Sequence, residues 1–265
     1  MELSVPQFDV VSNLFSFTIA TMGAAALFFF LSRPYVGHKY RPALMVSGLV
    51  VAIACYHYYR IYESWHGAYR LNESGTAYVP TGAAFNDAYR YADWILTVPL
   101  LMVELIAVLA LPRGEARSLL VKLVTASALM IGLGYPGEIS SDTGTRWLWW
   151  GLSMVPFLYI LYVLFTELTR SLERQPQAVR GLVSAARLVV LLTWSFYPIA
   201  YAILTVTGTK NPIGQVALQM GYTIADITAK AGFGLLIYFI AKLKSDTEAE
   251  SEPLARPVST GPAFA

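Results

Sequence analysis

Seven long apolar stretches constrain the fold of this chain more than any other feature of its sequence. Their approximate spans are residues 8–32, 42–64, 85–111, 117–136, 146–170, 181–207 and 213–242. A helix needs about 20 predominantly apolar residues to cross a hydrocarbon core of roughly 30 Å. Each stretch reaches that length, so the sequence predicts an all-α membrane protein, a bundle of seven transmembrane helices.

The composition agrees with a membrane protein. Of the 265 residues, 56% are hydrophobic and only 14% are charged, whereas soluble domains carry roughly 25% charged residues. The formal net charge of +2 gives no basic footprint for nucleic acid and, with the high hydrophobicity, argues against disorder. The single cysteine, Cys55, excludes an internal disulfide and a cysteine-based metal cluster. We expect no metal site, no nucleic-acid partner and no enzymatic activity.

The placement of Lys and Arg predicts how the chain lies in the cell membrane. Acidic residues precede the first stretch, which is too long for a signal-peptide core, so we expect it to be retained and the amino terminus to lie outside. The connections that then fall inside, and the region after the last stretch, carry Arg33, Lys39, Arg41, Arg113, Arg117, Arg170, Arg174, Arg180, Lys242 and Lys244. This excess of cations is the positive-inside pattern, and it predicts a cytoplasmic carboxyl terminus.

Two segments outside the apolar stretches have their own character. Residues 65–84 combine Gly and Pro with alternating Thr, Tyr and Val, which predicts a short β-hairpin over the outer face. Residues 245–265 are rich in Ser, Glu, Pro and Ala, so we expect a disordered cytoplasmic tail. Residues 1–244, including this hairpin, form a single membrane domain in this interpretation.

Lys230 lies deep in the last apolar stretch, with Asp226 one helical turn earlier on the same face. A charge at the bilayer centre costs at least a few kcal/mol unless it has a partner or a water-filled cavity. One interpretation is a structural ion pair between helices. The second is an amine in an apolar pocket that forms a Schiff base with an aldehyde, with Asp226 as its counterion. We favour the second, because a lysine at this depth cannot easily reach an interface.

The third stretch places Asp93, Thr97 and Glu104 roughly on one side of a helix. Eleven residues separate the carboxyl groups by about 16 Å along the axis, too far for a catalytic acid/base pair. The spacing suits a proton relay, in which Asp93 takes a proton near mid-membrane and Glu104, among Leu and Val near the inner surface, holds another. The alternative for Glu104 is an interfacial residue whose side chain extends towards the cytoplasm.

Three motifs resemble the microbial rhodopsins: Arg90-Tyr-Ala-Asp-Trp-Ile-Leu-Thr-Val-Pro99, Trp194-Ser-Phe-Tyr-Pro198, and the segment from Asp226 to Lys230. The agreement extends through all seven stretches. Narrower similarity to the proteorhodopsin and xanthorhodopsin branch lies in Tyr56-His-Tyr-Tyr-Arg60, Phe85-Asn-Asp-Ala-Tyr-Arg90 and Gly134-Tyr-Pro-Gly-Glu-Ile-Ser140.

The resemblance implies a light-driven outward proton pump in the bacterial plasma membrane. It implies that Lys230 binds all-trans retinal as a protonated Schiff base and that Asp93 and Asp226 are its counterions. Asp93 is then the primary proton acceptor, Glu104 the cytoplasmic donor, and Arg90 the arginine next to the counterions. Asp, Thr and Glu at positions 93, 97 and 104 are the family's pattern for proton pumps, because chloride pumps lack the first carboxylate and sodium pumps carry Asn, Asp and Gln.

The resemblance also assigns Trp94, Trp150, Trp194 and Tyr197 to the retinal pocket and Tyr58 to the surroundings of the counterion. Without the resemblance, most of these aromatic residues would be interpreted as helix packing. Two further positions carry finer implications. Leu101 implies green rather than blue absorption. Trp150 stands where carotenoid-binding members have glycine, so its bulky indole argues against a carotenoid antenna, whereas the similarity to the xanthorhodopsin branch points the other way.

His57 and Pro198 carry further expectations. By the resemblance, His57 hydrogen-bonds the acceptor Asp93 and tunes its proton affinity, although a histidine satisfied by another neighbour is the commoner case. Pro198, inside the sixth stretch, removes one backbone hydrogen bond and is expected to kink that helix.

Other functions remain open at this stage. A sensory photoreceptor with the same chromophore is the main alternative, and it would ordinarily lack a carboxylate at position 104. A light-gated channel is less favoured because no helix carries a row of polar residues, and a transporter without retinal would show no visible band. Family precedent indicates a homo-oligomer, a pentamer or trimer, in the lipid bilayer.

Overall fold

The computed structural model describes residues 1–251 except positions 87 and 209–210, and within these it has seven helical spans long and apolar enough to cross a membrane. Four spans are the single helices α1 (Val5–Ser32), α2 (Arg41–Ala68), α3 (Ala88–Leu109) and α4 (Arg113–Glu138). The remaining spans are α5 (Thr143–Phe165) with α6 (Glu167–Leu172), then α7 (Gln177–Thr207), and finally α8 (Pro212–Ile227), η3 (Thr228–Gly232) and α9 (Phe233–Ser251). The predicted seven-helix bundle is therefore confirmed.

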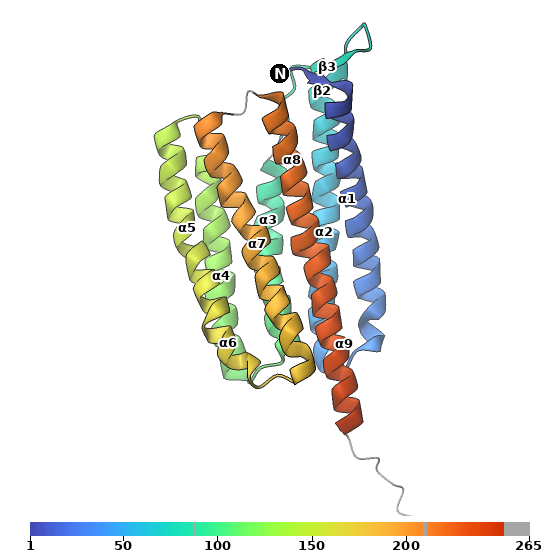
Figure 1. Ribbon diagram of the computed structural model, residues 1–265, viewed down its shortest axis with the longest axis vertical. Helices are drawn as coiled ribbons and strands as arrows, with labels where there is room; N and C mark the ends of the chain where they lie inside the picture. The colour runs from blue at the N-terminus through green and yellow to red at the C-terminus, as the bar shows by residue number, and fades with distance from the viewer. Residues whose placement is uncertain (87, 209–210, 252–265) are drawn as a thin grey trace, which may run out of the picture.

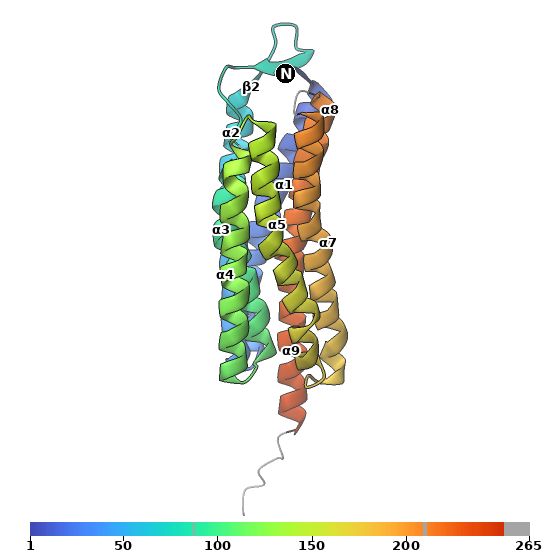
Figure 2. The same cartoon turned by 90° about the vertical axis from the view of Figure 1, so that its left-hand side faces the viewer.

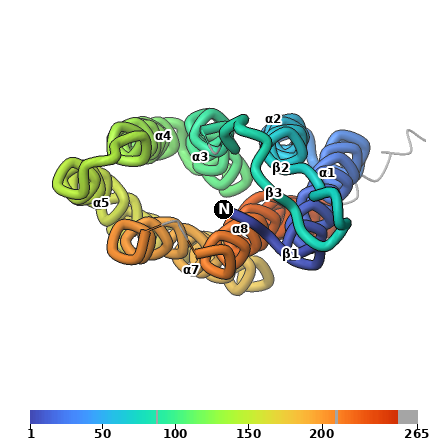
Figure 3. Tube along the Cα trace, turned by 90° about the horizontal axis from the view of Figure 1, so that it is seen from above, coloured from blue at the N-terminus to red at the C-terminus, as the bar shows by residue number. Residues whose placement is uncertain are grey.

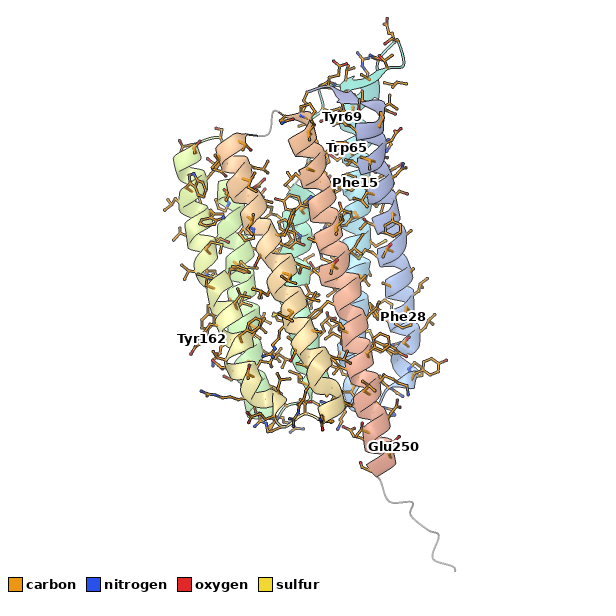
Figure 4. The ribbon with its side chains drawn as sticks, viewed as in Figure 1. Phe15, Phe28, Trp65, Tyr69, Tyr162 and Glu250 are labelled. Atoms are coloured by element: carbon orange, nitrogen blue, oxygen red, sulfur yellow. The ribbon has the colours of Figure 1, made fainter. Side chains whose placement is uncertain are left out.

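The spans lie side by side along the long axis of the molecule, with the amino terminus at one end and the end of α9 at the other (Figures 1 and 2). Viewed along this axis, the helices form a closed ring (Figure 3). The outer surface is apolar, as a lipid-facing surface must be: Leu192 is 71% exposed and Val206 74% exposed. Tyr162 points outward on the fifth span (Figure 4).

Small residues allow the helices to approach each other closely. A Cβ atom added to Gly48 of α2 would lie 2.6 Å from the ring of Phe30, and one added to Gly234 of α9 would lie 2.6 Å from the ring of Phe29. In lipid, helices associate through packing rather than through release of apolar surface from water, so such contacts stabilise the bundle. Both glycines hold the amino-terminal helix α1 against its neighbours.

A small antiparallel sheet covers the end of the bundle at which the chain begins. Strands β2 (Tyr69–Leu71) and β3 (Ala77–Pro80) form the hairpin predicted within residues 65–84, and β1 (Leu3–Ser4) pairs with the other side of β3. Ser4 then caps α1, because its Oγ accepts from the Gln7 backbone 3.3 Å away while the Gln7 side chain accepts from the Ser4 backbone. β1 has only two residues, too few for an alternating pattern to predict it.

The predicted tail boundary is wrong for residues 245–251, which continue α9 as a helix. Tertiary contacts stabilise this extension. Glu248 accepts from the Tyr40 hydroxyl and lies 2.8 Å from the Lys39 ammonium, and the buried Lys244 Nζ donates to the Leu109 carbonyl of α3, 2.7 Å away. These contacts are with other parts of the chain, so they could not be predicted from the composition of the segment. The rest of the predicted disordered tail, residues 252–265, lies outside the described residues.

The fifth span is interrupted where α5 gives way to α6 at Thr166, whose φ of −113° and ψ of −68° depart from helical values. Arg187 of α7 occupies this interruption: its Nη1 donates to the Leu164 carbonyl at 3.3 Å and to Thr169 Oγ1 at 2.6 Å. A backbone carbonyl that has lost its helical partner within the membrane needs another donor. Arg187 supplies one here.

Candidate functional site

A cavity lies in the middle of the bundle, with about 800 Å³ not occupied by protein atoms. Its walls come from α3, α4, α5, α7 and the seventh span, and its lining is mostly aromatic or apolar. The lining residues are Tyr91, Trp94, Val98, Leu101, Met130, Ile131, Gly134, Trp150, Ser153, Met154, Phe157, Trp194, Tyr197, Pro198, Tyr201, Tyr222, Asp226, Ala229 and Lys230. Such a pocket, apolar with a few convergent polar groups, is typical of a site for a small organic ligand.

Lys230 contributes the only primary amine among the cavity's lining residues. It lies in η3, a five-residue π-helical turn that joins α8 to α9; turns of this kind occur frequently at functional sites. Its side chain is 2% exposed, and its Nζ lies 2.8 Å from Asp226 Oδ1 and 2.8 Å from Asp93 Oδ2. One buried cation therefore stands between two buried carboxylates, one from its own helix and one from α3.

Asp226 is held by several donors at once. Its Oδ1 accepts from the Tyr197 hydroxyl at 2.6 Å and from the Trp94 indole N–H at 3.3 Å, in addition to Lys230. Its Oδ2 accepts from the Tyr58 hydroxyl at 2.7 Å. Hydrogen bonds donated to a carboxylate favour its charged form, so these partners stabilise Asp226 as a fixed anion.

Arg90 lies next to this anion, in the first turn of α3, and is 2% exposed. Its Nη1 donates to the Tyr58 hydroxyl at 3.1 Å and lies 3.9 Å from Asp226 Oδ2. Its Nη2 donates to Gln219 Oε1 at 2.5 Å. The guanidinium partly balances the second carboxylate and is connected to it through a shared tyrosine.

Asp93 differs from Asp226 in its partners. Its Oδ2 contacts Lys230 and accepts from the Thr97 hydroxyl at a long 3.4 Å. Its Oδ1 is buried and has no hydrogen-bond partner among the residues described. A buried oxygen without a partner is energetically costly and is relieved when the carboxyl group takes up a proton.

His57 does not make the predicted hydrogen bond to Asp93. The His57 Nδ1 lies 3.7 Å from Asp93 Oδ1, beyond hydrogen-bonding distance, and 3.0 Å from the carbonyl oxygen of Ile53 in its own helix. The prediction is wrong for this geometry, because the turn of helix that carries the imidazole supplies a nearer acceptor. His57 remains close enough to Asp93 for a direct electrostatic interaction between them.

Glu104 lies on α3 away from the cavity and is 0% exposed. Within the part of the chain that the structure describes, neither of its carboxyl oxygens makes a hydrogen bond. Its polar neighbour is the Ser47 hydroxyl of α2, which donates to the Ala43 carbonyl at 3.1 Å. Its neighbours along α3, Leu101 and Leu105, belong to the main apolar core. This burial argues against the interfacial interpretation. A carboxyl group in such surroundings is stable only as the neutral acid.

The structure brings most of the predicted site residues together. Asp93, Asp226, Lys230, Arg90 and Tyr58 form one connected buried cluster. The predicted pocket residues line the cavity together with Leu101: Trp94, Trp150, Trp194 and Tyr197. Tyr58 is not in the lining and lies at the counterion, as predicted, where it donates to Asp226. Thr97 is buried at Asp93, where its hydroxyl also donates to the Asp93 backbone carbonyl at 2.9 Å.

Two further predictions concern Trp150 of the fifth span and Pro198 of the sixth. The Trp150 indole N–H donates to the Pro198 carbonyl at 3.0 Å, and both residues line the cavity. The indole therefore occupies the wall of the cavity between α5 and α7. The kink expected at Pro198 stays a prediction.

Several site residues were not predicted from the sequence. Tyr222 lines the cavity and its ring lies 5.0 Å from the Arg90 guanidinium, while Gln219 accepts from Arg90. Tyr222 precedes Asp226 by four residues, so the face shared with Asp226 and Lys230 was a signal that could have identified it. Gln219 is buried through a contact with another helix, which no local pattern reports. Cavity residues from α4, such as Met130, carry no functional group that could mark them as site residues in the sequence.

Comparisons with known proteins give matches over almost the whole chain. The family model described as "Bacteriorhodopsin-like protein" matches residues 9–243. The blue-light absorbing proteorhodopsin of Gamma-proteobacterium Hot 75m4 is 32% identical over 239 residues, which cover 89% of this chain and 88% of that protein.

Two solved structures are similar in both sequence and fold. Xanthorhodopsin, described as a light-driven ion pump with dual chromophore, is 54% identical with a TM-score of 0.90, and the match covers 94% of this chain and 98% of that one. Thermophilic rhodopsin is 50% identical with a TM-score of 0.90, and the match covers 93% of this chain and 98% of that one.

Proposed function

The chain belongs to the family of bacteriorhodopsin-like proteins, and we propose that it is a light-driven outward proton pump with all-trans retinal bound to Lys230 as a protonated Schiff base. The matches to a proteorhodopsin and to xanthorhodopsin confirm the predicted branch of the family. Members of this family are multi-pass proteins of the cell membrane that bind retinal. The finer assignments, the ion and the residue roles, are supported by the geometry of the buried cluster.

The residues of the cavity fit retinal. An apolar, aromatic chamber ends at a buried primary amine, and carboxylates on two helices face that amine at 2.8 Å. Flat aromatic rings such as those of Trp94 and Trp194 provide large contact areas for a planar polyene. Retinal, when bound, supplies visible absorption and a light-driven change of shape next to the Lys230 nitrogen.

The unequal surroundings of the two carboxylates carry the proposed direction of proton transfer. Asp226 accepts from Tyr58, Tyr197 and Trp94 and remains an anion, whereas Asp93 has an oxygen with no partner among the described residues. A proton leaving the Lys230 nitrogen is therefore stabilised more on Asp93 than on Asp226. In this proposal Asp93 is the acceptor, and Asp226, balanced by Arg90, keeps the site's negative charge.

Glu104 is the proposed cytoplasmic donor. As a buried neutral acid it carries a proton that it can give to the Lys230 nitrogen after Asp93 has taken the first one, and it then regains a proton from the cytoplasm. A donor carboxyl at this position favours a pump over the alternative, a sensory photoreceptor. Each proton moved outward against 100 mV requires about 2.3 kcal/mol, so access to the Lys230 nitrogen must change sides between the two transfers.

Leu101 and Trp150 determine two optical properties in this proposal. Leu101 lines the cavity and is the residue that the resemblance associates with green absorption. Blue-light and green-light absorbing proteorhodopsins are each 32% identical to this chain, so overall identity does not decide the colour. The Trp150 indole fills the cavity wall and is fixed by its bond to Pro198, which supports a pump with no carotenoid antenna.

The pump is tested by illuminating an unbuffered suspension of cells that express the protein with retinal and recording the external pH. We expect acidification in the light that a protonophore abolishes, and none in cells with the Lys230→Ala variant. No pH change, or a passive signal that the protonophore enhances, would rule out the outward pump and favour a sensory receptor or a channel.

A further inference from the structure

A groove that the proposed proton pathway does not use lies at the end of the bundle opposite the amino terminus. It is formed by the end of α1, the short turns η1 (Arg33–Tyr35) and η2 (His38–Tyr40), and the start of α2. The groove has an apolar part and a basic part, and its lining residues are Phe30, Leu31, Pro34, Pro42 and Met45 together with Arg33, His38 and Arg41.

The two arginines of the groove are positioned by weak or neutral partners. Arg33 Nε donates to the Phe30 carbonyl at 3.0 Å, and its Nη1 lies 3.8 Å from Met45 Sδ. Arg41 Nε donates to the Val36 carbonyl at 3.4 Å, and its Nη1 lies 3.2 Å from His38 Nδ1. Each guanidinium has five N–H donors, so these contacts leave most of the donors available to a ligand in the groove.

Arg33 and Arg41 also lack a counter-charge among the described residues, since no acidic side chain there lies within ion-pair distance of either. The neighbouring cation is different: Lys39 pairs with Glu248 at 2.8 Å. The groove therefore combines two guanidinium groups without anions, and a third basic side chain, His38, at a membrane boundary. Guanidinium groups bind phosphate through paired, charge-assisted hydrogen bonds.

The apolar part of the groove faces the region occupied by lipid chains. Leu31 is 70% exposed and Met45 is 36% exposed. Leu27, one turn before Leu31 on α1, continues this apolar surface towards the bilayer centre and is 65% exposed. A free phosphate ion would leave this apolar surface uncovered, whereas a phospholipid matches both parts at once.

We propose that this groove is a specific site for one anionic phospholipid of the cytoplasmic leaflet. The phosphate and head group lie between Arg33 and Arg41, and an acyl chain lies along Leu31, Met45 and Leu27. The assignment to the cytoplasmic leaflet rests on the proposed orientation of the chain. The charge of the groove selects an anionic over a zwitterionic head group, because each basic residue near the surface attracts an anionic lipid by about 1 kcal/mol, which is roughly a fivefold change in affinity.

Native mass spectrometry of the purified full chain tests the site. The protein is mixed in detergent with phosphatidylglycerol or with phosphatidylcholine of the same acyl chains, and bound lipid is counted. We expect one phosphatidylglycerol to be retained preferentially, and the preference to fall roughly 25-fold in Arg33→Gln/Arg41→Gln. The control Arg113→Gln/Arg117→Gln removes two cations from the same end of the bundle but outside the groove, and is expected to keep the preference.

Two further measurements keep the test decisive. The helical circular dichroism of each variant must match that of the wild type, which separates loss of the site from loss of the fold. A second double variant, Arg33→Lys/Arg41→Lys, keeps both positive charges and is expected to retain part of the preference for phosphatidylglycerol. Equal retention of the two lipids, an unchanged preference in Arg33→Gln/Arg41→Gln, or complete displacement of the lipid by millimolar inorganic phosphate would overturn the proposal. None of these outcomes bears on pumping, which is measured separately.

Discussion

Asp93 and Asp226 carry the same side chain and lie at the same 2.8 Å from Lys230, yet their hydrogen-bond partners differ. Asp226 accepts from two tyrosines and a tryptophan, while one oxygen of Asp93 has no partner in the described part of the chain. The sequence placed Asp226 on the face of Lys230, because four residues separate them. The difference in roles came only from the resemblance, since the partners of each carboxylate come from other helices.

Replacing Asp93 with the isosteric Asn removes the proposed proton acceptor. We expect Asp93→Asn to retain the visible band but to lower light-driven acidification by about 100-fold or more, the range that proton-transfer groups contribute. The band should also move to the red, because the Asp93 carboxylate stabilises the proposed Schiff-base cation more in its ground state than in its excited state. Spectra and pump currents of Asp93→Asn and wild type measure both effects. Full pumping in Asp93→Asn would contradict the acceptor role.

Acid titration of the wild type tests the same residue without mutation. Protonation neutralises Asp93 as the pH falls, so the wild-type band should shift to the red and coincide with that of Asp93→Asn at low pH. The band of Asp93→Asn should stay fixed over the same range, because the titrating group is gone. A wild-type spectrum that is unchanged between mildly alkaline and acidic pH would count against Asp93 as the counterion.

Glu104→Gln tests the donor. The amide has the shape of the carboxylic acid but no proton to give, so the Lys230 nitrogen must regain its proton from the cytoplasm directly. We expect the late photocycle to slow roughly tenfold for each unit of rising pH, because the free proton concentration then sets the rate. Flash spectroscopy at several pH values measures this, with wild type as the control. Wild-type kinetics at all pH values would exclude Glu104 from the pathway.

At the scale of elements, the helical spans could be predicted because long apolar runs determine them. Their ends could not. α9 extends to Ser251 through contacts of Glu248 and Lys244 with other segments. The π-helical turn that carries Lys230 has no sequence signature either, and β1 forms only because the hairpin provides an edge for it.

The contact between α9 and α3 leads to a prediction about stability. Lys244 Nζ donates to the carbonyls of Val108 and Leu109 and to Gln175 Oε1, at 3.2, 2.7 and 2.7 Å. Lys244→Met keeps the apolar stem but leaves these buried acceptors unpaired, which costs about 1–3 kcal/mol. We expect a lower thermal midpoint in detergent.

The control for this change is Lys242→Met, two residues away. Lys242 pairs with Asp246 on the surface of the same helix, and exposed pairs of this kind contribute about 0–1 kcal/mol. Its thermal midpoint should stay close to that of the wild type. Equal midpoints for Lys244→Met and Lys242→Met would show that the buried contacts do not stabilise the bundle.

At the scale of the whole molecule, the helices form a ring around a cavity whose lining comes from every span except the first two. The aromatic residues of that lining are visible in the sequence, but which of them face inward depends on how the helices rotate against each other. Among the lining residues, Trp150 matters most for the molecule as a whole. In the proposed pump, its indole closes the cavity wall between α5 and α7.

Trp150→Gly should remove that closure. The change deletes the indole and its bond to the Pro198 carbonyl, and it opens the cavity wall. With a carotenoid such as canthaxanthin added, we expect retinal fluorescence to be excited through carotenoid absorption in Trp150→Gly but not in the wild type. The conservative variant Trp150→Phe is the control. Energy transfer in the wild type would contradict the absence of an antenna.

The most direct test of the whole interpretation is the visible spectrum of the purified protein after addition of all-trans retinal. The wild type should develop a band in the green, and Lys230→Ala, which lacks the amine but keeps Asp93 and Asp226, should develop none while keeping its helical circular dichroism. A colourless wild type, or a band that persists in folded Lys230→Ala, would contradict the assignment of Lys230 as the residue that binds retinal.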